Sequence, residues 1–177
     1  MSRDRGQTWS ESEGFRRILG RWWWFSPAES LFKAYVDSIV VSPTDPSLVI
    51  AGIELGAVVR SADGGHTWSK HCAGAGRDCH MLATHATDGR WIYEAGGGGP
   101  AQSSDAGLTW TKRRAGLDRR YAYACCADPA DPELWYLAAS PGPGTAYSWA
   151  NARANIFRFA NGAWEKLRGG LPQPIVA

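Results

Sequence analysis

The sequence lacks any long apolar segment and carries little net charge. No hydrophobic run approaches the roughly 18 residues that a membrane span needs, and Arg3, Asp4 and Arg5 stand where a signal peptide would have an apolar stretch. Nineteen basic and 17 acidic residues leave a net charge of +2, which gives no electrostatic reason to expect a nucleic acid or a membrane as the partner. We therefore expect a cytoplasmic protein that binds neither.

Cysteine is also scarce, and its spacing excludes the usual metal sites. The four cysteines are Cys72, Cys79, Cys125 and Cys126, with no C-x-x-C pair and no zinc pattern. The last two lie on an apolar run, which predicts buried free thiols. The glycine tract 96–99 is not followed by Lys-Ser or Lys-Thr, so it predicts a tight loop rather than a phosphate cradle. We expect no metal and no cofactor.

Glycine, proline and tryptophan are abundant. The chain has 21 Gly, 10 Pro and 10 Trp among 177 residues, and 44% of its residues are hydrophobic. Frequent turn residues predict short strands joined by tight turns, and large rings fill the space between sheets. The composition favours an all-β fold.

An eight-residue pattern, Ser-x-Asp-x-Gly-x-Thr-Trp, occurs three times, and we call each copy a box turn. In such a turn the Asp accepts hydrogen bonds from its own backbone, the Gly takes a positive φ, and the Trp packs between sheets. A carboxylate satisfied in this way is structural rather than catalytic. The matching residues are Ser2, Asp4, Gly6, Thr8 and Trp9; Ser61, Asp63, Gly65, Thr67 and Trp68; and Ser103, Asp105, Gly107, Thr109 and Trp110.

A second repeat fixes the period. Asp45, Asp88 and Asp131 follow one another at intervals of 43 positions, and an apolar strand follows each of them. A period of about 40 to 50 residues with four short strands per unit is typical of a propeller blade. The sequence therefore predicts a partial β-propeller.

The predicted organisation is a single partial propeller of about three four-stranded blades with incomplete blades at both ends. In the first full blade we expect strands at 35–41, 48–52, 57–61 and 67–71, and in the third an insertion at 140–155 and a degenerate box at 159–164. The predicted units are 1–34 (the end of one blade and a connection), 35–72, 79–114 and 120–168 (blades), and 169–177 (the start of the next connection).

The repeats resemble those of the BNR or Asp-box propellers, which include sialidases, sortilin-type receptors and photosystem II stability-factor-like proteins. The resemblance covers nearly the whole chain, and stretches 36–43, 93–99 and 134–138 are most similar to bacterial BNR-repeat proteins without a demonstrated activity. Closed propellers have 4 to 8 blades. The resemblance therefore implies that open blade edges self-associate, or that a longer parent chain supplies the missing blades.

Polar residues recur where the predicted inner strands begin, on the face of the propeller opposite the box turns. Loops on this channel face are where propellers generally bind ligands. The alternatives are a pocket for a polar ligand and a ring of salt bridges between blades. His80 and His85 should point to opposite faces of their strand, so they form no joint metal site. The candidate residues are Asp37, Glu54, Arg77, Asp78, His80, Glu94, Arg119, Arg120 and Tyr121.

Three functions remain open. The first is a non-catalytic module that binds a protein or a glycan through the channel face. The second is an exo-sialidase type of glycoside hydrolase, but the Arg-Ile-Pro type of motif near the N-terminus of that family is absent here, so we assign no catalytic residue. The third is an assembly factor resembling the photosystem II stability proteins. The aromatic run 22–25 would form a stacking platform if exposed, and we expect it to be packed against the first blade.

Overall fold

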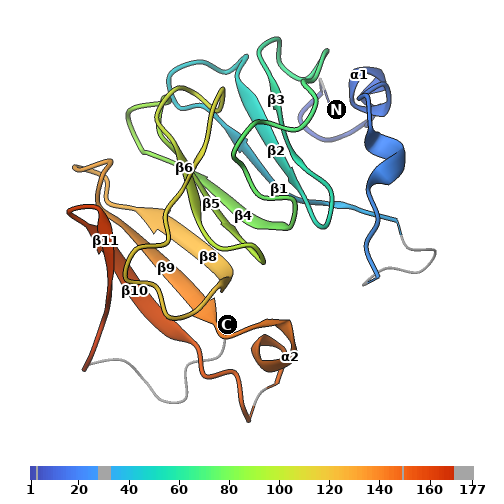
Figure 1. The fold of residues 1–177 in the computed structure, drawn as a ribbon. Coiled ribbons are helices and arrows are strands. Elements are labelled where there is room, and N and C mark those ends of the chain that lie inside the picture. Colours follow the sequence, from blue (N-terminus) through green and yellow to red (C-terminus); the bar gives the residue numbers. More distant parts are fainter. Residues whose placement is uncertain (3, 28–32, 149, 170–177) are drawn as a thin grey trace.

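The computed structural model describes residues 1–2, 4–27, 33–148 and 150–169, and almost all of its regular structure is β-strand (Figure 1). The predicted connection at 169–177 lies outside these residues beyond Gly169. The short helices are α1 (Glu13–Arg16), the 3-10 helix η1 (Arg21–Trp23) and α2 (Pro143–Ala146). The strands are β1 (Val36–Val41), β2 (Val49–Ile53), β3 (Val58–Ser61), β4 (Cys79–Thr84), β5 (Ile92–Gly96), β6 (Ala101–Ser103), β7 (Thr111–Lys112), β8 (Tyr121–Ala127), β9 (Trp135–Ser140), β10 (Asn155–Ala160) and β11 (Ala163–Lys166).

The strands form three antiparallel sheets that lie side by side (Figure 1). The first contains β1-β2-β3, the second β4-β5-β6-β7 and the third β8-β9-β10-β11, each in chain order. The first strand of each sheet is its inner strand, and β4 packs between β1 and β8. Three successive up-and-down sheets arranged in this way are blades of a partial β-propeller, which confirms the predicted fold class.

Apolar side chains fill the space between neighbouring sheets. Between the first two sheets, Gly52 lies so close to Cys79 that a Cβ on the glycine would stand 2.2 Å from its Sγ. Between the second and third sheets, Trp135 is fully buried against Tyr93, with ring centroids 5.1 Å apart. This packing fixes neighbouring sheets relative to one another, because well-packed interiors resist displacement.

The first sheet differs from prediction because the expected fourth strand at 67–71 does not form a regular ladder. The backbone N–H of Ser69 still donates to the Arg60 carbonyl, at 2.8 Å. The N–H of Arg60, however, donates to Ser69 Oγ, and that of Val58 donates to His71 Nδ1. Side chains thus replace the backbone acceptors that a fourth strand would supply.

The carboxylates of the box turns accept hydrogen bonds within their own turns. In the second turn Asp63 accepts from the Thr67 backbone N–H at 2.8 Å and from its hydroxyl at 2.5 Å, and Gly65 takes a φ of +88°. These hydrogen bonds hold the pKa of Asp63 at about 2. The equivalent bonds form at Asp4 and Asp105. The carboxylates are therefore committed to their own turns.

The three tryptophans of the box turns differ in burial. Trp110 is buried as predicted, and Trp68 packs edge-on against Phe15 at 5.3 Å between ring centroids. Trp9 is 76% exposed, so the prediction of packing between sheets is wrong for it. Among the described residues, no sheet lies on the outer side of Trp9 to cover it.

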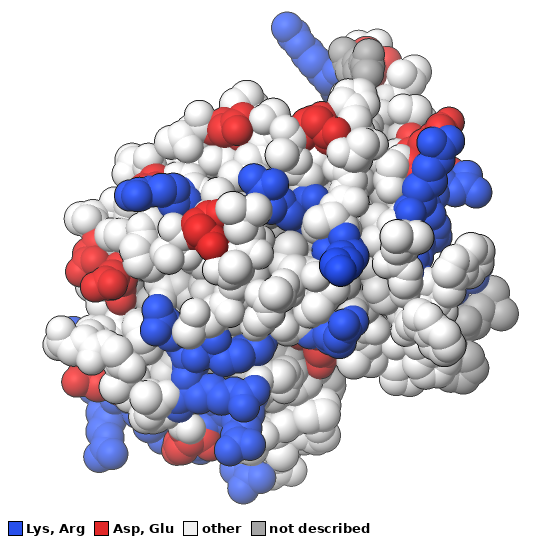
Figure 2. Space-filling view, turned by 45° about the horizontal axis from the view of Figure 1, so that its top comes forward, with Lys and Arg blue, Asp and Glu red and all other residues white. Residues whose placement is uncertain are grey.

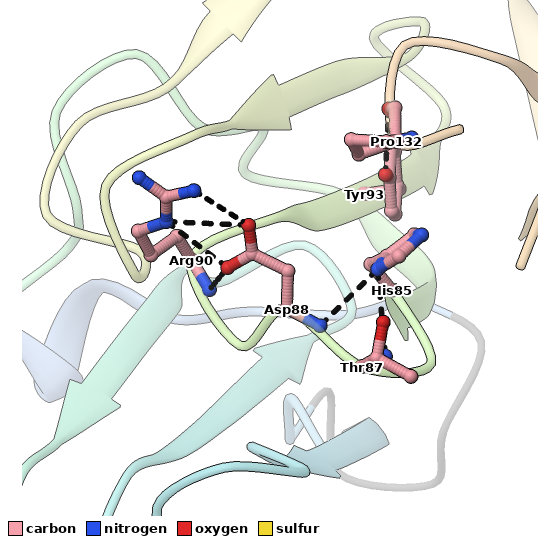
Figure 3. Close-up of polar contacts among 6 residues, drawn as sticks. All are labelled: His85, Thr87, Asp88, Arg90, Tyr93 and Pro132. Atoms are coloured by element: carbon pink, nitrogen blue, oxygen red, sulfur yellow. Dashed lines mark hydrogen bonds and ion pairs between the residues drawn. The ribbon is translucent and has the colours of Figure 1, made fainter. Parts of the chain in front are cut away.

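The aspartates at intervals of 43 residues also make turns, each between the first two strands of its sheet. Figure 3 shows the second, where the Arg90 backbone N–H donates to Asp88 Oδ1 at 3.1 Å and His85 Nδ1 accepts from the backbone of Thr87 and Asp88. The same turn recurs at Asp45, which accepts from Ser47 N–H, and at Asp131, which accepts from Glu133 N–H. The period thus has a local physical cause.

The third of these turns also joins two blades. The Tyr93 hydroxyl on β5 donates to the Pro132 carbonyl at 2.7 Å (Figure 3). Pro132 lies directly after Asp131 in the turn that precedes β9. This contact ties the second sheet to the third.

The degenerate box of the third blade is a tight hairpin. Asn161 and Gly162 connect β10 to β11 with φ values of +52° and +81°, and Ala160 pairs with Ala163. Two successive positive φ angles are typical of a type I′ turn, for which Asn-Gly is the favoured pair. Loss of the box pattern therefore leaves strand pairing intact.

The N-terminal segment covers part of the outer face of the first sheet. Ile18 is buried against it, and Phe15 and Trp24 pack beside Ile18. Trp22 and Trp23 are 94% and 88% exposed, so the expected packing of the whole run 22–25 is wrong. Both exposed rings belong to the 3-10 helix η1, which has no buried residue, and Trp24 directly after it packs on the sheet. No helix among the described residues is long and apolar enough to cross a membrane.

The adjacent residues Cys125 and Cys126 lie on β8, where successive side chains point to opposite faces of the sheet. Cys125 is buried as predicted, and burial raises the pKa of its thiol. Cys126 is exposed, which corrects the prediction for that residue. Successive side chains of a strand point to opposite faces, so adjacent cysteines cannot share one environment.

Candidate functional site

Each of the three inner strands carries a β-bulge at the same place in its blade. The pairing register shifts between Val36 and Ser38 in β1, between Cys79 and Met81 in β4, and between Ala122 and Ala124 in β8. The bulged residues are Asp37, His80 and Tyr123, which succeed one another at the 43-residue interval of the turns. A bulge takes one residue out of the ladder and redirects its side chain, and bulges are frequent beside active sites.

Two of the bulged side chains are in contact, and the third lies within electrostatic range of both. The rings of His80 and Tyr123 lie 5.5 Å apart between centroids. The charge of Asp37 acts on both His80 and Tyr123. Three neighbouring blades thus contribute one equivalent polar side chain each to a common cluster.

A second set of equivalent positions lies two residues earlier in each blade and completes the cluster. It consists of Tyr35, Asp78 and Tyr121, again at intervals of 43 residues. Tyr121 is 7% exposed and its ring lies 4.7 Å from that of His80. We call these six residues, together with Glu54 and Tyr147, the bulge cluster.

Only 4% of the His80 side chain is exposed. Its Nδ1 lies 2.7 Å from the Ala122 carbonyl oxygen, and its Nε2 lies 3.5 Å from Asp78 Oδ1 without a hydrogen-bond partner among the described residues. Burial lowers the pKa of His80, but Asp78, the Ala122 carbonyl and Asp37 together outweigh burial and raise it. The cluster therefore favours positive charge on the imidazole.

The first blade contributes two carboxylates to the cluster, Asp37 and Glu54. Desolvation raises the pKa of Asp37; the imidazole of His80 opposes this rise, while the charges of Glu54 and Asp78 add to it. Glu54 follows β2 and accepts a hydrogen bond from the Ser26 hydroxyl at 2.5 Å. Burial and the Glu54 carboxylate raise the pKa of Tyr35. Acidic groups thus gather at the start of β1.

The insertion of the third blade adds a tyrosine. Tyr147 directly follows α2 and is 66% exposed, and its hydroxyl lies 2.9 Å from that of Tyr121. Its ring meets that of Tyr123 edge-on, with centroids 6.1 Å apart. Gly97 leaves room beside these rings, since a Cβ there would stand 1.8 Å from Asp78 Oδ2. The tight glycine loop predicted at 96–99 therefore borders the cluster.

Four predicted site residues do not join the cluster. Glu94 lies inside β5 rather than in a loop and is fully buried, because its carboxylate accepts from the Gly76 backbone N–H at 2.8 and 3.0 Å. Arg77 donates to the Gly56 carbonyl and Arg119 to the Arg153 carbonyl, so both guanidinium groups tie loops together. Arg120, the residue after Arg119, is exposed.

Three tyrosines of the cluster, Tyr35, Tyr123 and Tyr147, were not among the candidate residues predicted from the sequence. Tyr123 was recoverable, because the 43-residue interval that joins Asp37 to His80 leads directly to it. Tyr147 was not, because it lies in the insertion that only the third blade carries. The residues that the cluster does include from the prediction are Asp37, Glu54, Asp78, His80 and Tyr121.

Charge elsewhere on the surface is mixed. Figure 2 shows Lys and Arg side chains gathered at the lower left of the face it draws, on the side of the third sheet, with acidic side chains between other basic groups. This alternation agrees with the net charge of +2. Within the described ranges, no group of three or more His, Cys, Asp or Glu side chains is arranged to hold a metal ion.

The fold and the cluster together define a partial β-propeller with a polar and aromatic site at the start of its inner strands. Solved propeller structures resemble it. An ancestral GH74 enzyme matches 83% of this chain at 19% identity with a TM-score of 0.64, and the GH74 xyloglucanase from Xanthomonas campestris matches 78% at 22% identity with a TM-score of 0.58. YCF48 from Cyanidioschyzon merolae matches 76% at 19% identity with a TM-score of 0.53.

These similarities establish the fold alone. The chain spans 22% and 23% of the two GH74 chains and 37% of the YCF48 chain. No protein-family model matches the sequence, and neither does any curated protein. Membership of the BNR or Asp-box family therefore stays a prediction from the repeats.

Proposed function

We propose that this chain is a non-catalytic binding module that recognises a segment of a protein or a glycan at the bulge cluster. The observation that carries the proposal is the convergence of three bulged side chains, Asp37, His80 and Tyr123, from three successive blades. A bulge interrupts strand pairing, so its recurrence needs a reason other than the stability of the sheet.

The composition of the cluster supports binding over a purely structural role. Tyr35, Tyr123 and Tyr147 are 37%, 38% and 66% exposed, so their rings are accessible for stacking. A ring of inter-blade salt bridges would instead pair Lys or Arg with the acids. Among the described residues, neither Asp37 nor Asp78 makes an ion pair with a Lys or Arg.

The exposed ring of Tyr123 gives a direct test. We expect screening of peptide and glycan arrays to yield ligands whose affinity falls about tenfold in Tyr123→Ala, since a well-placed aromatic contact contributes on the order of 1 kcal/mol beyond its buried area. Titration calorimetry measures the change. Leu108→Ala is the matched control, because Leu108 is 59% exposed on a box turn at the other end of its sheet. Ligands that bind both variants equally would place the site elsewhere.

Self-association is the second part of the proposal, and the outer faces of the two terminal sheets support it. On the third sheet, Ala124, Tyr136, Ala138 and Ile156 line a shallow apolar hollow of about 260 Å³. On the first sheet, Ile39 is 61% exposed. The internal blade interfaces bury faces of the same kind, so we propose that the first sheet of one copy packs on the third sheet of another.

Light scattering on the eluting protein tests this association. We expect a discrete dimer at micromolar concentration and a monomer for Ala138→Arg, because a buried, unpaired guanidinium opposes packing of the apolar faces. Ser104→Arg, an exposed change within a box turn, should leave the dimer intact. A monomer at every concentration would refute association through these faces.

A further inference from the structure

The bulge cluster carries excess negative charge. Asp37, Glu54 and Asp78 approach one another closely enough for the two others to raise the pKa of Asp37. Within the described residues, the one basic group in ion-pair range of these carboxylates is His80, 3.5 Å from Asp78. Up to three negative charges therefore gather where the described residues supply one basic group in ion-pair range.

The hydrogen bonding of the buried His80 imidazole bears on which ligand the cluster can bind. A carbonyl oxygen can only accept, so the 2.7 Å contact between Ala122 O and His80 Nδ1 places the proton of neutral His80 on Nδ1. Its Nε2 is then an acceptor, and it faces the Asp78 carboxylate, another acceptor, at 3.5 Å with no donor between them among the described residues. The donor between these two acceptors is either a proton on Nε2, which the raised pKa of His80 favours, or an external cation.

The surrounding rings suit a cation as well. Tyr35, Tyr123 and Tyr147 are the exposed members, and aromatic faces attract ammonium and guanidinium groups within about 6 Å. A metal ion is a poor fit, because no three His, Cys, Asp or Glu side chains in the described ranges have the arrangement of a metal site. Tyrosine rings around carboxylates favour an organic cation.

We propose that the bulge cluster binds the side-chain cation of a lysine or arginine on a protein segment, with Asp37 and Asp78 as its counter-charges and Tyr123 and Tyr147 as its aromatic walls. The inference rests on the binding role proposed above and selects one ligand class from it. A neutral glycan would leave the carboxylates without a counter-charge, and an anionic sugar would be repelled by them.

Nuclear magnetic resonance of the tyrosine ring signals tests the proposal with three probes. They are a glycine–serine decapeptide with one central lysine, the same peptide with that lysine acetylated, and a neutral β-glucan oligosaccharide. We expect the lysine peptide to shift the signals of Tyr123 and Tyr147. The acetylated peptide should bind at least tenfold more weakly, because acetylation removes the charge and the charge-assisted hydrogen bonds.

Paired variants locate the counter-charge. Asp37→Asn, a change of an exposed strand residue, should weaken the lysine peptide about tenfold, the usual effect of removing one charged hydrogen-bond partner. Asp118→Asn is the control, because Asp118 is 57% exposed and pairs with Arg119 outside the cluster. It should leave the affinity unchanged.

The outcomes separate the two proposals. Equal binding of the acetylated and unmodified peptides, or binding of the oligosaccharide alone, would overturn the cation site and leave the binding module standing. Shifts confined to residues outside the bulge cluster, or no shift with any probe, would overturn both. Loss of lysine-peptide binding in Asp37→Asn but not in Asp118→Asn would support both.

Discussion

Trp135→Ala should lower the free energy of unfolding by about 4 kcal/mol, in the range found when a fully buried large aromatic is truncated. Trp135 is 0% exposed, and its ring contacts those of Tyr93, Phe159 and Trp164 at centroid distances of 5.1, 5.8 and 4.6 Å. The substitution removes the side chain that joins the second and third sheets. Urea denaturation followed by circular dichroism measures the loss.

The exposed tryptophan Trp22 provides the control for this experiment. It is 94% exposed, so Trp22→Ala should change the free energy of unfolding by no more than about 0.5 kcal/mol. A loss below 1 kcal/mol for Trp135→Ala would mean that the third sheet does not depend on this interface for its stability. Equal losses for the two variants would mean that the N-terminal segment is packed more tightly than its exposure indicates.

Glu94→Ala should be nearly as damaging, with a loss of about 3 kcal/mol. The buried carboxylate accepts both hydrogen bonds from Gly76 N–H and lies 3.7 Å from Lys112 Nζ. Alanine would leave the N–H buried without an acceptor and Lys112 without its counter-charge, and removal of one partner from a buried pair is costly. Thermal unfolding of this variant beside Glu165→Ala, which removes an exposed carboxylate, gives the comparison.

Glu94→Gln distinguishes the shape of this side chain from its charge. Burial raises the pKa of Glu94, although the Lys112 ammonium and the Gly76 N–H oppose the rise. A carboxyl group with a raised pKa in the folded state favours folding most below its unfolded pKa, and this contribution is lost as pH rises through the folded value. The stability of Glu94→Gln relative to the native protein should therefore increase between pH 4 and pH 8. A constant difference across that range would contradict the raised pKa.

The repeats predicted the fold because each has a local physical cause. The carboxylate of Asp63 is satisfied within eight residues of chain, and the turn at Asp88 within three. Such short-range patterns can be recognised without knowledge of the tertiary structure. The fourth strand of the first sheet was overpredicted because Ser69 and His71 divert hydrogen bonds to their side chains, which no strand pattern reveals.

The candidate site was predicted less completely, for a different reason. Asp37 and His80 stood out as polar residues at the start of apolar strands, but their bulges depend on pairing with β2 and β5. Glu94 was predicted as the equivalent of Glu54 in the next blade. It lies three residues before the position that the 43-residue interval gives, and it is fully buried within β5. Counting every position against the interval from Asp45 to Asp88 would have excluded Glu94 and included Tyr123.

In the binding module proposed above, the bulges also separate the residues that would contact a ligand from those that pair the strands. Asp37, His80 and Tyr123 stand outside the register of the inner strands. A substitution at one of these positions changes the chemistry presented to a ligand while the flanking backbone pairs remain available to the sheet. If the cluster binds a ligand as proposed, its specificity depends on three residues that lie 43 positions apart, and a change at the exposed Asp37 or Tyr123 would alter it with less effect on packing than a change at the buried His80.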